Sequence, residues 1–120
     1  MHAMSHPIGG VLGAHHGLTN AVVMPYVLKF NESVIGTKMD TLSSYLGLSK
    51  KGTTGVIDWV LGLRERLGIP HTLSDLGVKP EGIPLLAQMA VVDPTASGNP
   101  VSATQADYER LFHASLEGRV

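Results

Sequence analysis

The sequence predicts an all-α protein, a bundle of five or six helices joined by short connections. Apolar residues recur at spacings of three and four along most of the chain, and glycine and proline separate the periodic segments. No stretch shows the strict alternation of a half-buried strand. Hydrophobic residues make up 43% of the chain but aromatic residues only 5%, which is typical of a helical core packed by aliphatic side chains.

Length and composition limit the classes of function. The chain has 120 residues, enough for one domain spanning 1–120 with its own core. Nine basic and ten acidic residues give a net charge of −1, so we expect no nucleic-acid or anionic-membrane partner. The absence of cysteine excludes disulfides and thiolate metal ligands. We find no signal peptide and no apolar run of ~18 residues, so a cytoplasmic protein is expected.

The first two helices follow from glycine and proline positions. Residues 1–8 are expected to form the end of a helix stopped by Pro7 and the glycines after it. Residues 17–31 are apolar on nearly every side, which predicts a buried helix kinked by Pro25. Thr19 and Asn20 interrupt this apolar surface. They either cap locally or bond to the loop carrying His16, and we favour capping.

The middle of the chain predicts a pair of amphipathic helices. Residues 32–46 place apolar side chains on one face, and the polar loop 49–55 supplies Thr53 or Thr54 as the N-cap of the next helix. That helix, residues 56–67, is expected to direct Leu67 toward the core. Its charged run Arg64, Glu65 and Arg66 is expected to face solvent, and Trp59 is interpreted as a packing residue.

The C-terminal third is expected to contain two further helices. Residues 83–92 form a buried helix that leads into a loop over 93–101. Thr104 and Asp107 have the spacing of a capping box at the start of the last helix. The core side of that helix is expected to consist of Tyr108, Leu111, Phe112 and Ser115.

Four of the six histidines lie near the amino end. His2 and His6 share one face of a helix at i and i+4, and His15 and His16 return after a glycine turn. Imidazole suits zinc, iron, copper and nickel, so the grouping indicates a metal site. The alternative is that these histidines cap or pack helices. His71 is interpreted as a surface or capping residue rather than a ligand, and His113 is expected to be exposed.

Two segments resemble a known family. HAMSHPIGG followed by HHGLTNAVVMPYVLKFN resembles the metal-binding signature of the iron-containing (group III) alcohol dehydrogenases, and LRERLGIPHTLSDLGV resembles a later family segment. The resemblance runs from His2 to about Leu116. It implies the C-terminal helical half of a dehydroquinate synthase-like, iron alcohol dehydrogenase fold.

The resemblance also implies roles for single residues. His2 and His16 match the two metal-ligand histidines, His16 thereby contributing to cofactor binding, and His6 matches a catalytic histidine lining the substrate and nicotinamide pocket. His15 falls on a position that the family does not hold fixed. Thr95 lies in a loop that returns to the substrate pocket in the family. Val101 stands where the family usually has arginine, which puts the role of that arginine in doubt here.

Two parts of the family pattern are absent from this sequence. Relatives complete the metal site with an Asp and a His that lie upstream, and they bind NAD(P) through an N-terminal domain. We therefore expect a fragment of an Fe²⁺ (or Zn²⁺) enzyme acting on a small alcohol or aldehyde, inactive alone and binding NAD(P) only with the missing domain. The alternatives are a non-catalytic helical module, forming homo-oligomers or docking on a nucleotide-binding domain, and a small stand-alone histidine metal-binding protein.

Overall fold

The computed structural model describes residues 1–120 and confirms the all-α prediction, with six α-helices, three short 3₁₀ helices and no strand. The α-helices are α1 (His2–Leu12), α2 (His16–Phe30), α3 (Glu32–Tyr45), α4 (Gly52–Arg66), α5 (Ile83–Val91) and α6 (Gln105–Glu117). The 3₁₀ helices are η1 (Ser74–Leu76), η2 (Pro80–Gly82) and η3 (Pro94–Gly98). No helix has the length and apolar character needed to cross a membrane.

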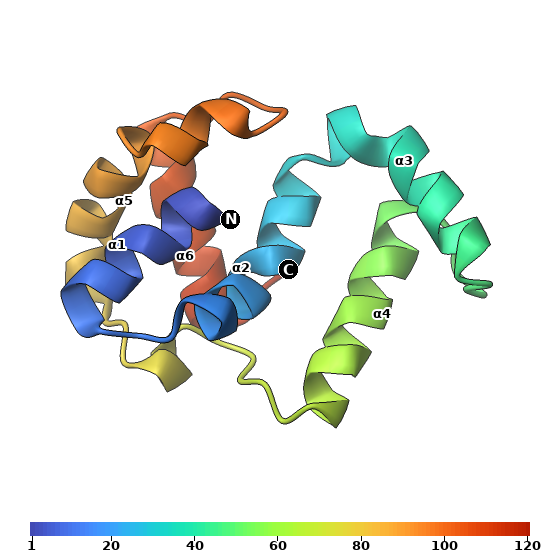
Figure 1. Ribbon diagram of the computed structural model, residues 1–120, viewed down its shortest axis with the longest axis horizontal. Coiled ribbons are helices and arrows are strands. Elements are labelled where there is room, and N and C mark those ends of the chain that lie inside the picture. Colours follow the sequence, from blue (N-terminus) through green and yellow to red (C-terminus); the bar gives the residue numbers. More distant parts are fainter.

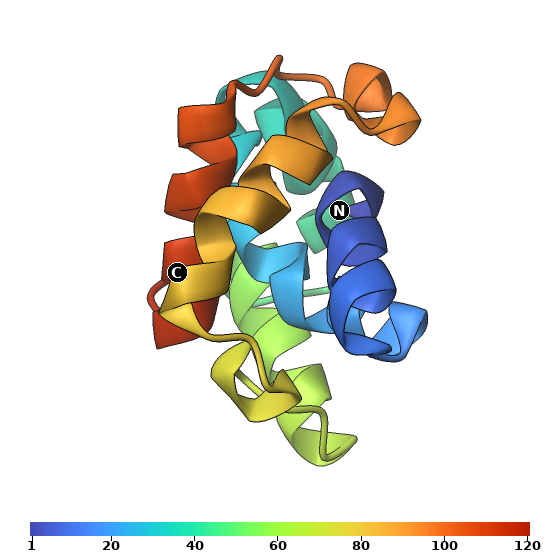
Figure 2. The same cartoon turned by 90° about the vertical axis from the view of Figure 1, so that its left-hand side faces the viewer.

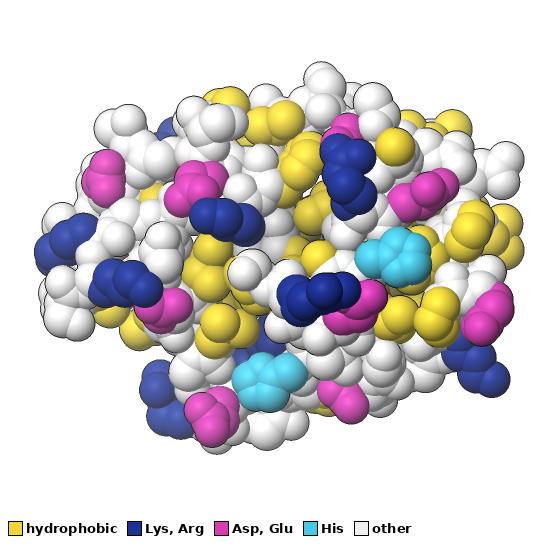
Figure 3. Space-filling view, turned by 180° about the vertical axis from the view of Figure 1, so that it is seen from behind, with side chains coloured by type: hydrophobic (Ala, Val, Ile, Leu, Met, Phe, Trp, Pro, Cys, Tyr) yellow, Lys and Arg dark blue, Asp and Glu magenta, His cyan; other side chains and the backbone are white.

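The helices form two groups that share α2 (Figure 1). Helices α1, α5 and α6 pack on one side of α2, and the hairpin of α3 and α4 stands on the other. Seen from the side, α6, α5 and α1 follow one another across the first group (Figure 2). On the face shown in Figure 3, basic and acidic side chains are interspersed, with no large area of one charge.

The hydrophobic core lies within the first group. Its members come from α1, α2, α5 and α6, together with the segment between α4 and α5. Burying an aliphatic side chain completely contributes about 1.5–3 kcal/mol, so this cluster dominates the stability of the fold. The core residues with no exposed surface are Met4, Ile8, Val22, Val23, Leu73, Ile83, Ala87, Ala90 and Phe112.

The expected end of the first helix was wrong. Helix α1 continues through Pro7 and both following glycines to Leu12, and it ends at Gly13, whose φ of 66° is the left-handed conformation that glycine adopts freely. Pro7 and Ile8 are buried in the same face as Met4. Burial of that face outweighs the one backbone hydrogen bond that proline removes.

The hairpin also departs from the sequence expectations. The expected apolar face of α3 is largely exposed, since Ser43 is its only buried residue. Helix α4 begins at Gly52, whose N–H donates to the Ser43 hydroxyl at 3.0 Å, so neither Thr53 nor Thr54 is the N-cap. Leu67, expected in the core, is 64% exposed. The exposed apolar side chains of the two helices and their ends are Val34, Leu42, Tyr45, Leu46, Trp59 and Leu67, so Trp59 is not enclosed by packing either.

The last helix follows its prediction. Thr104 and Asp107 form the capping box at the start of α6, each side chain bonding to the backbone N–H of the other residue. His113 is exposed, as expected. The four residues predicted for the core side, Tyr108, Leu111, Phe112 and Ser115, are all buried.

Arg64, expected to face solvent, is only 2% exposed. The reason is Pro25, which lies inside α2 and has no N–H for the carbonyl oxygen of Ala21 four residues earlier. The Arg64 guanidinium donates to that oxygen at 3.3 Å and to the Val22 carbonyl oxygen at 2.8 Å. It also donates to the His71 carbonyl oxygen at 3.1 Å. An arginine from α4 thus compensates for a proline in α2.

This pairing predicts non-additive stabilities. Arg64→Met should lower the free energy of unfolding by about 1–3 kcal/mol, because buried carbonyl groups lose their donor. In a Pro25→Ala background the restored N–H serves Ala21, so the same replacement should cost less. Urea denaturation of the two single variants and the double variant measures the difference. Equal costs in both backgrounds would contradict the pairing.

Candidate active site

Three imidazole rings form a group at the surface, defined by His2 and His6 of α1 and His16 of α2. The ring centroids of His2 and His16 are 5.1 Å apart, those of His6 and His16 5.3 Å, and those of His2 and His6 5.8 Å. All three residues are exposed. The two on α1 face outward because Ala3, Met4 and the following buried residues occupy the opposite side of the helix.

His15 stands apart from this group. It is the N-cap of α2, and its Nδ1 accepts from the backbone N–H of Leu18 at 3.4 Å. The capping interpretation therefore holds for His15. The tight turn that precedes it brings His16 back beside the first helix.

His16 is contacted on both ring nitrogens. Its Nδ1 lies 3.2 Å from the hydroxyl oxygen of Ser5, and its Nε2 lies 2.9 Å from the amide nitrogen of Asn20. The capping expectation does not hold for Thr19, whose hydroxyl donates to the His15 carbonyl oxygen at 3.1 Å and so leaves the N-cap to His15. For Asn20 it was also wrong, because the first turn of α2 places its amide beside the His16 ring.

His6 is paired with an acid from a distant part of the chain. Its Nδ1 lies 2.9 Å from Oδ2 of Asp93, which follows α5. The other carboxylate oxygen of Asp93 accepts from the backbone N–H of Thr95 at 2.8 Å and from its hydroxyl at 2.5 Å. Burial raises the pKa of Asp93, but the hydrogen bonds from Thr95 and His6 outweigh it and hold the pKa below its usual value.

Asp93 is a residue that sequence reasoning missed. The segment 93–101 was expected as a loop, and Thr95 was singled out within it. The structure shows that 94–98 form η3 with Asp93 as its N-cap. Asp followed by Pro and Thr is a signal for the start of a short helix. Nothing in the sequence shows that this Asp contacts His6.

A pair of asparagines holds this segment to α2. Asn31 donates to the side-chain oxygen of Asn99 at 2.9 Å, and Asn99 donates back to Asn31 at 2.8 Å. Asn99 also donates to the carbonyl oxygen of Val101 at 2.7 Å. The end of η3 is therefore attached to the end of α2.

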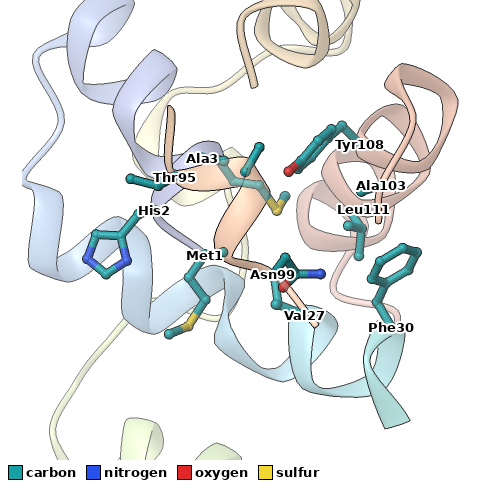
Figure 4. Close-up of a pocket in the computed structure, with 13 residues that line it drawn as sticks. Met1, His2, Ala3, Val27, Phe30, Thr95, Asn99, Ala103, Tyr108 and Leu111 are labelled. Carbon is teal, nitrogen blue, oxygen red and sulfur yellow. The ribbon is translucent and has the colours of Figure 1, made fainter. Parts of the chain in front are cut away.

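A cavity of about 170 Å³ lies between α1, α2, η3 and α6 (Figure 4). Thr95 borders it, and the hydroxyl group of Tyr108 points into it. Burial, with a smaller effect from the charge of Asp93, raises the pKa of Tyr108. His2 borders the cavity, but its ring points away from the centre. The apolar part of the lining includes Met4, Val27, Phe30 and Leu111.

The imidazole group has ligand chemistry that suits a metal ion but does not by itself form a metal site. Neutral imidazole is a good ligand for divalent first-row metals, and the His2 and His16 rings are neighbours. Yet no three His, Asp or Glu side chains converge in an arrangement that could hold an ion. The donors present fit a metal as two of its ligands and leave the others to be supplied.

Comparison with known proteins places the chain in a class. Residues 1–116 match the model of the Fe-containing alcohol dehydrogenase family, C-terminal, and the chain belongs to that family. The resemblance drawn from the histidine segment is thereby confirmed.

Individual relatives agree with this assignment. Lactaldehyde reductase of Escherichia coli K12 is 34% identical over 121 residues, which cover 96% of this chain and 32% of the relative. 1,3-Propanediol dehydrogenase of Citrobacter freundii is 31% identical, over 97% of this chain and 32% of its own length. The crystal structure of a 1,3-propanediol oxidoreductase superposes with a TM-score of 0.89 at 30% identity, covering 96% of this chain and 32% of that one. The chain thus spans about a third of the length of these relatives.

The lowered pKa of Asp93 predicts how stability depends on pH. The folded-state pKa lies below the unfolded value of about 3.8, so its contribution is fully present above that pH and is lost as pH falls through the folded value. Asp93→Asn should make the acid loss of unfolding free energy shallower, although Asp107, whose pKa is also lowered, still contributes. Urea denaturation between about pH 2 and 6 tests this. An unchanged slope would contradict it.

Proposed function

We propose that this chain supplies two metal-binding histidines and part of the substrate pocket of a metal-dependent, NAD(P)-linked alcohol dehydrogenase. The observation that carries the proposal is the imidazole group itself. Three rings from two helices lie within 6 Å of one another in a chain of the Fe-containing alcohol dehydrogenase family. Fe²⁺ is the proposed ion, with Zn²⁺ as the alternative, because imidazole ligands alone do not select between them.

His2 and His16 would hold the ion, and the remaining ligands would come from protein beyond these residues. When bound, a divalent ion polarises the alcohol oxygen and lowers its pKa, so that hydride can pass to a nicotinamide. The relatives are about three times as long as this chain, which supports a separate NAD(P)-binding part. The proposed activity therefore belongs to the assembled enzyme.

His6 and Asp93 are proposed to handle the proton. Asp93, which is partly buried, contacts Nδ1 of His6 and so orients the ring and leaves Nε2 free to exchange a proton. Thr95 supports the carboxylate from the other side through two hydrogen bonds. In this arrangement Thr95 acts through Asp93 as well as bordering the cavity.

The substrate class follows from the relatives. Their names specify lactaldehyde, 1,3-propanediol and methanol, all small alcohols or aldehydes. We propose the same class for the assembled enzyme.

A second candidate function is a non-catalytic helical module that docks on a nucleotide-binding domain or on a second copy of itself. The number of exposed apolar side chains on α3 and α4 favours it, since exposed apolar surface can mark an interaction site. Tyr45 is 87% exposed and Val34 59%. This candidate requires no metal, which separates it from the first.

Metal uptake tests the proposal. We expect a chimaera joining this chain to the preceding two thirds of the Escherichia coli lactaldehyde reductase to retain Fe²⁺ and to oxidise small alcohols with NAD. His16→Ala should abolish both, because one ligand is lost, and metal analysis after gel filtration measures the first. His113→Ala, an exposed histidine on α6, is the matched control and should change neither. A chimaera that retains metal equally well without His16 would support docking without a metal role.

The proton role predicts a separate effect in the same chimaera. Asp93→Asn should lower kcat/KM by about 10²-fold with the metal content unchanged, because the orienting carboxylate is lost. His6→Asn should have a similar effect, and the double variant should lose little more, since the two residues act as a unit. Steady-state kinetics measure all three. Multiplicative losses would show that the residues act independently.

A further inference from the structure

Ser5 lies between the two histidines proposed as metal ligands and has no exposed surface. Its hydroxyl oxygen is 3.1 Å from the carbonyl oxygen of His2 and 3.2 Å from Nδ1 of His16. A carbonyl oxygen only accepts, so the single hydroxyl hydrogen points to His2. The Ser5 oxygen then presents lone pairs to His16, and Nδ1 must supply the hydrogen of that contact.

Asn20 imposes the same requirement from the opposite side of the ring. Its amide nitrogen, which only donates, lies 2.9 Å from Nε2 of His16. Nε2 must therefore carry a lone pair. The tautomer with hydrogen on Nδ1 satisfies all three contacts at once.

The opposite tautomer satisfies fewer contacts. With hydrogen on Nε2, two N–H groups of His16 and Asn20 face each other, and Nδ1 competes with His2 for the one Ser5 hydrogen. Turning the Asn20 amide removes the first conflict but not the second. In the structure, Oδ1 of Asn20 is buried without a hydrogen-bond partner. Turning the amide would leave the amide nitrogen in that position instead, so it gains nothing there.

We infer that Ser5 and Asn20 are positioning residues that hold His16 as the Nδ1–H tautomer, with its Nε2 lone pair available to a cation. A free imidazole side chain in water favours the other tautomer, so the protein changes the intrinsic preference. The use of that lone pair rests on the proposed function. In the proposed metal site, the Asn20 amide contacts Nε2 until an ion displaces it. Rotation of the displaced amide would then allow its oxygen, which has no hydrogen-bond partner, to accept from a donor.

Long-range ¹H–¹⁵N correlation spectra of the histidine rings test the inference in the whole chain, treated with EDTA at about pH 8.5, where imidazole is neutral. His16 should appear as the Nδ1–H tautomer. The same spectrum contains controls of the opposite kind. Nδ1 of His15 accepts from Leu18, and Nδ1 of His71 lies 3.0 Å from the Arg64 guanidinium, so both should be Nε2–H.

Variants separate the two positioning residues. Ser5→Ala should shift His16 toward a mixture of tautomers, and Ser5→Thr should restore the Nδ1–H form. Asn20→Asp should favour the Nε2–H form, because a carboxylate only accepts. In each folded variant His15 and His71 should keep their tautomers. Because a free imidazole also favours the Nε2–H form, the helical circular dichroism spectrum of each variant reports separately that the fold is intact.

A wild-type spectrum with His16 as Nε2–H overturns the inference and needs no variant to fold. Persistence of the pure Nδ1–H form in both Ser5→Ala and Asn20→Asp also overturns it. Because the measurement is made without metal, its result can overturn this inference without bearing on the proposed function. If His16 is the Nδ1–H tautomer but the chimaera retains no ion, the inference about the tautomer stands and only the metal role is refuted.

Discussion

The packing of α1 against α2 and α5 determines whether this molecule has a site at all. Met4 and Ile8 are completely buried on one side of α1, and this leaves His2 and His6 on the opposite side. The left-handed Gly13 then reverses the chain so that His16 begins the next helix beside them. The imidazole group is therefore a consequence of core burial, because the packed helices below it set the backbone positions of its three residues.

Polar contacts connect the rest of the site to that core. Residue 93 is 87 positions from residue 6 along the chain, and the contact between them depends on how η3 is held. The reciprocal amide bonds of Asn31 and Asn99 attach η3 to α2. On the other side of α2, Arg64 compensates for the proline that interrupts its backbone bonding. Helix α2 thus anchors the histidine group, the Asp93 segment and the α3–α4 hairpin together.

Much of this fold could be predicted because helical periodicity and capping are local properties. The α6 capping box needs only residues 104 and 107, and the family resemblance needs only contiguous segments. Pro7 predicts a helix end that the structure does not have, because the cost of proline is local whereas the burial that outweighs it is not. Arg64 and Asp93 were missed for the same reason, since their partners at residues 21, 22 and 6 lie far away in sequence. A charged run can be assigned to the surface, and a polar segment to a loop, only when none of its side chains bonds to a residue far away in the sequence.

The separation of the α3–α4 hairpin from the main core has a dynamic consequence. None of its residues belongs to the principal hydrophobic cluster, and it contacts the other helices mainly through α2. Segments with few shared buried contacts open at a lower free energy than the molecule as a whole. Amide protons in α3 and α4 are therefore expected to exchange with solvent through partial opening, and those of the main core to require opening at a higher free energy. The histidine-bearing half stays ordered during excursions of the hairpin, so the two halves of this small protein differ in lifetime as well as in chemistry.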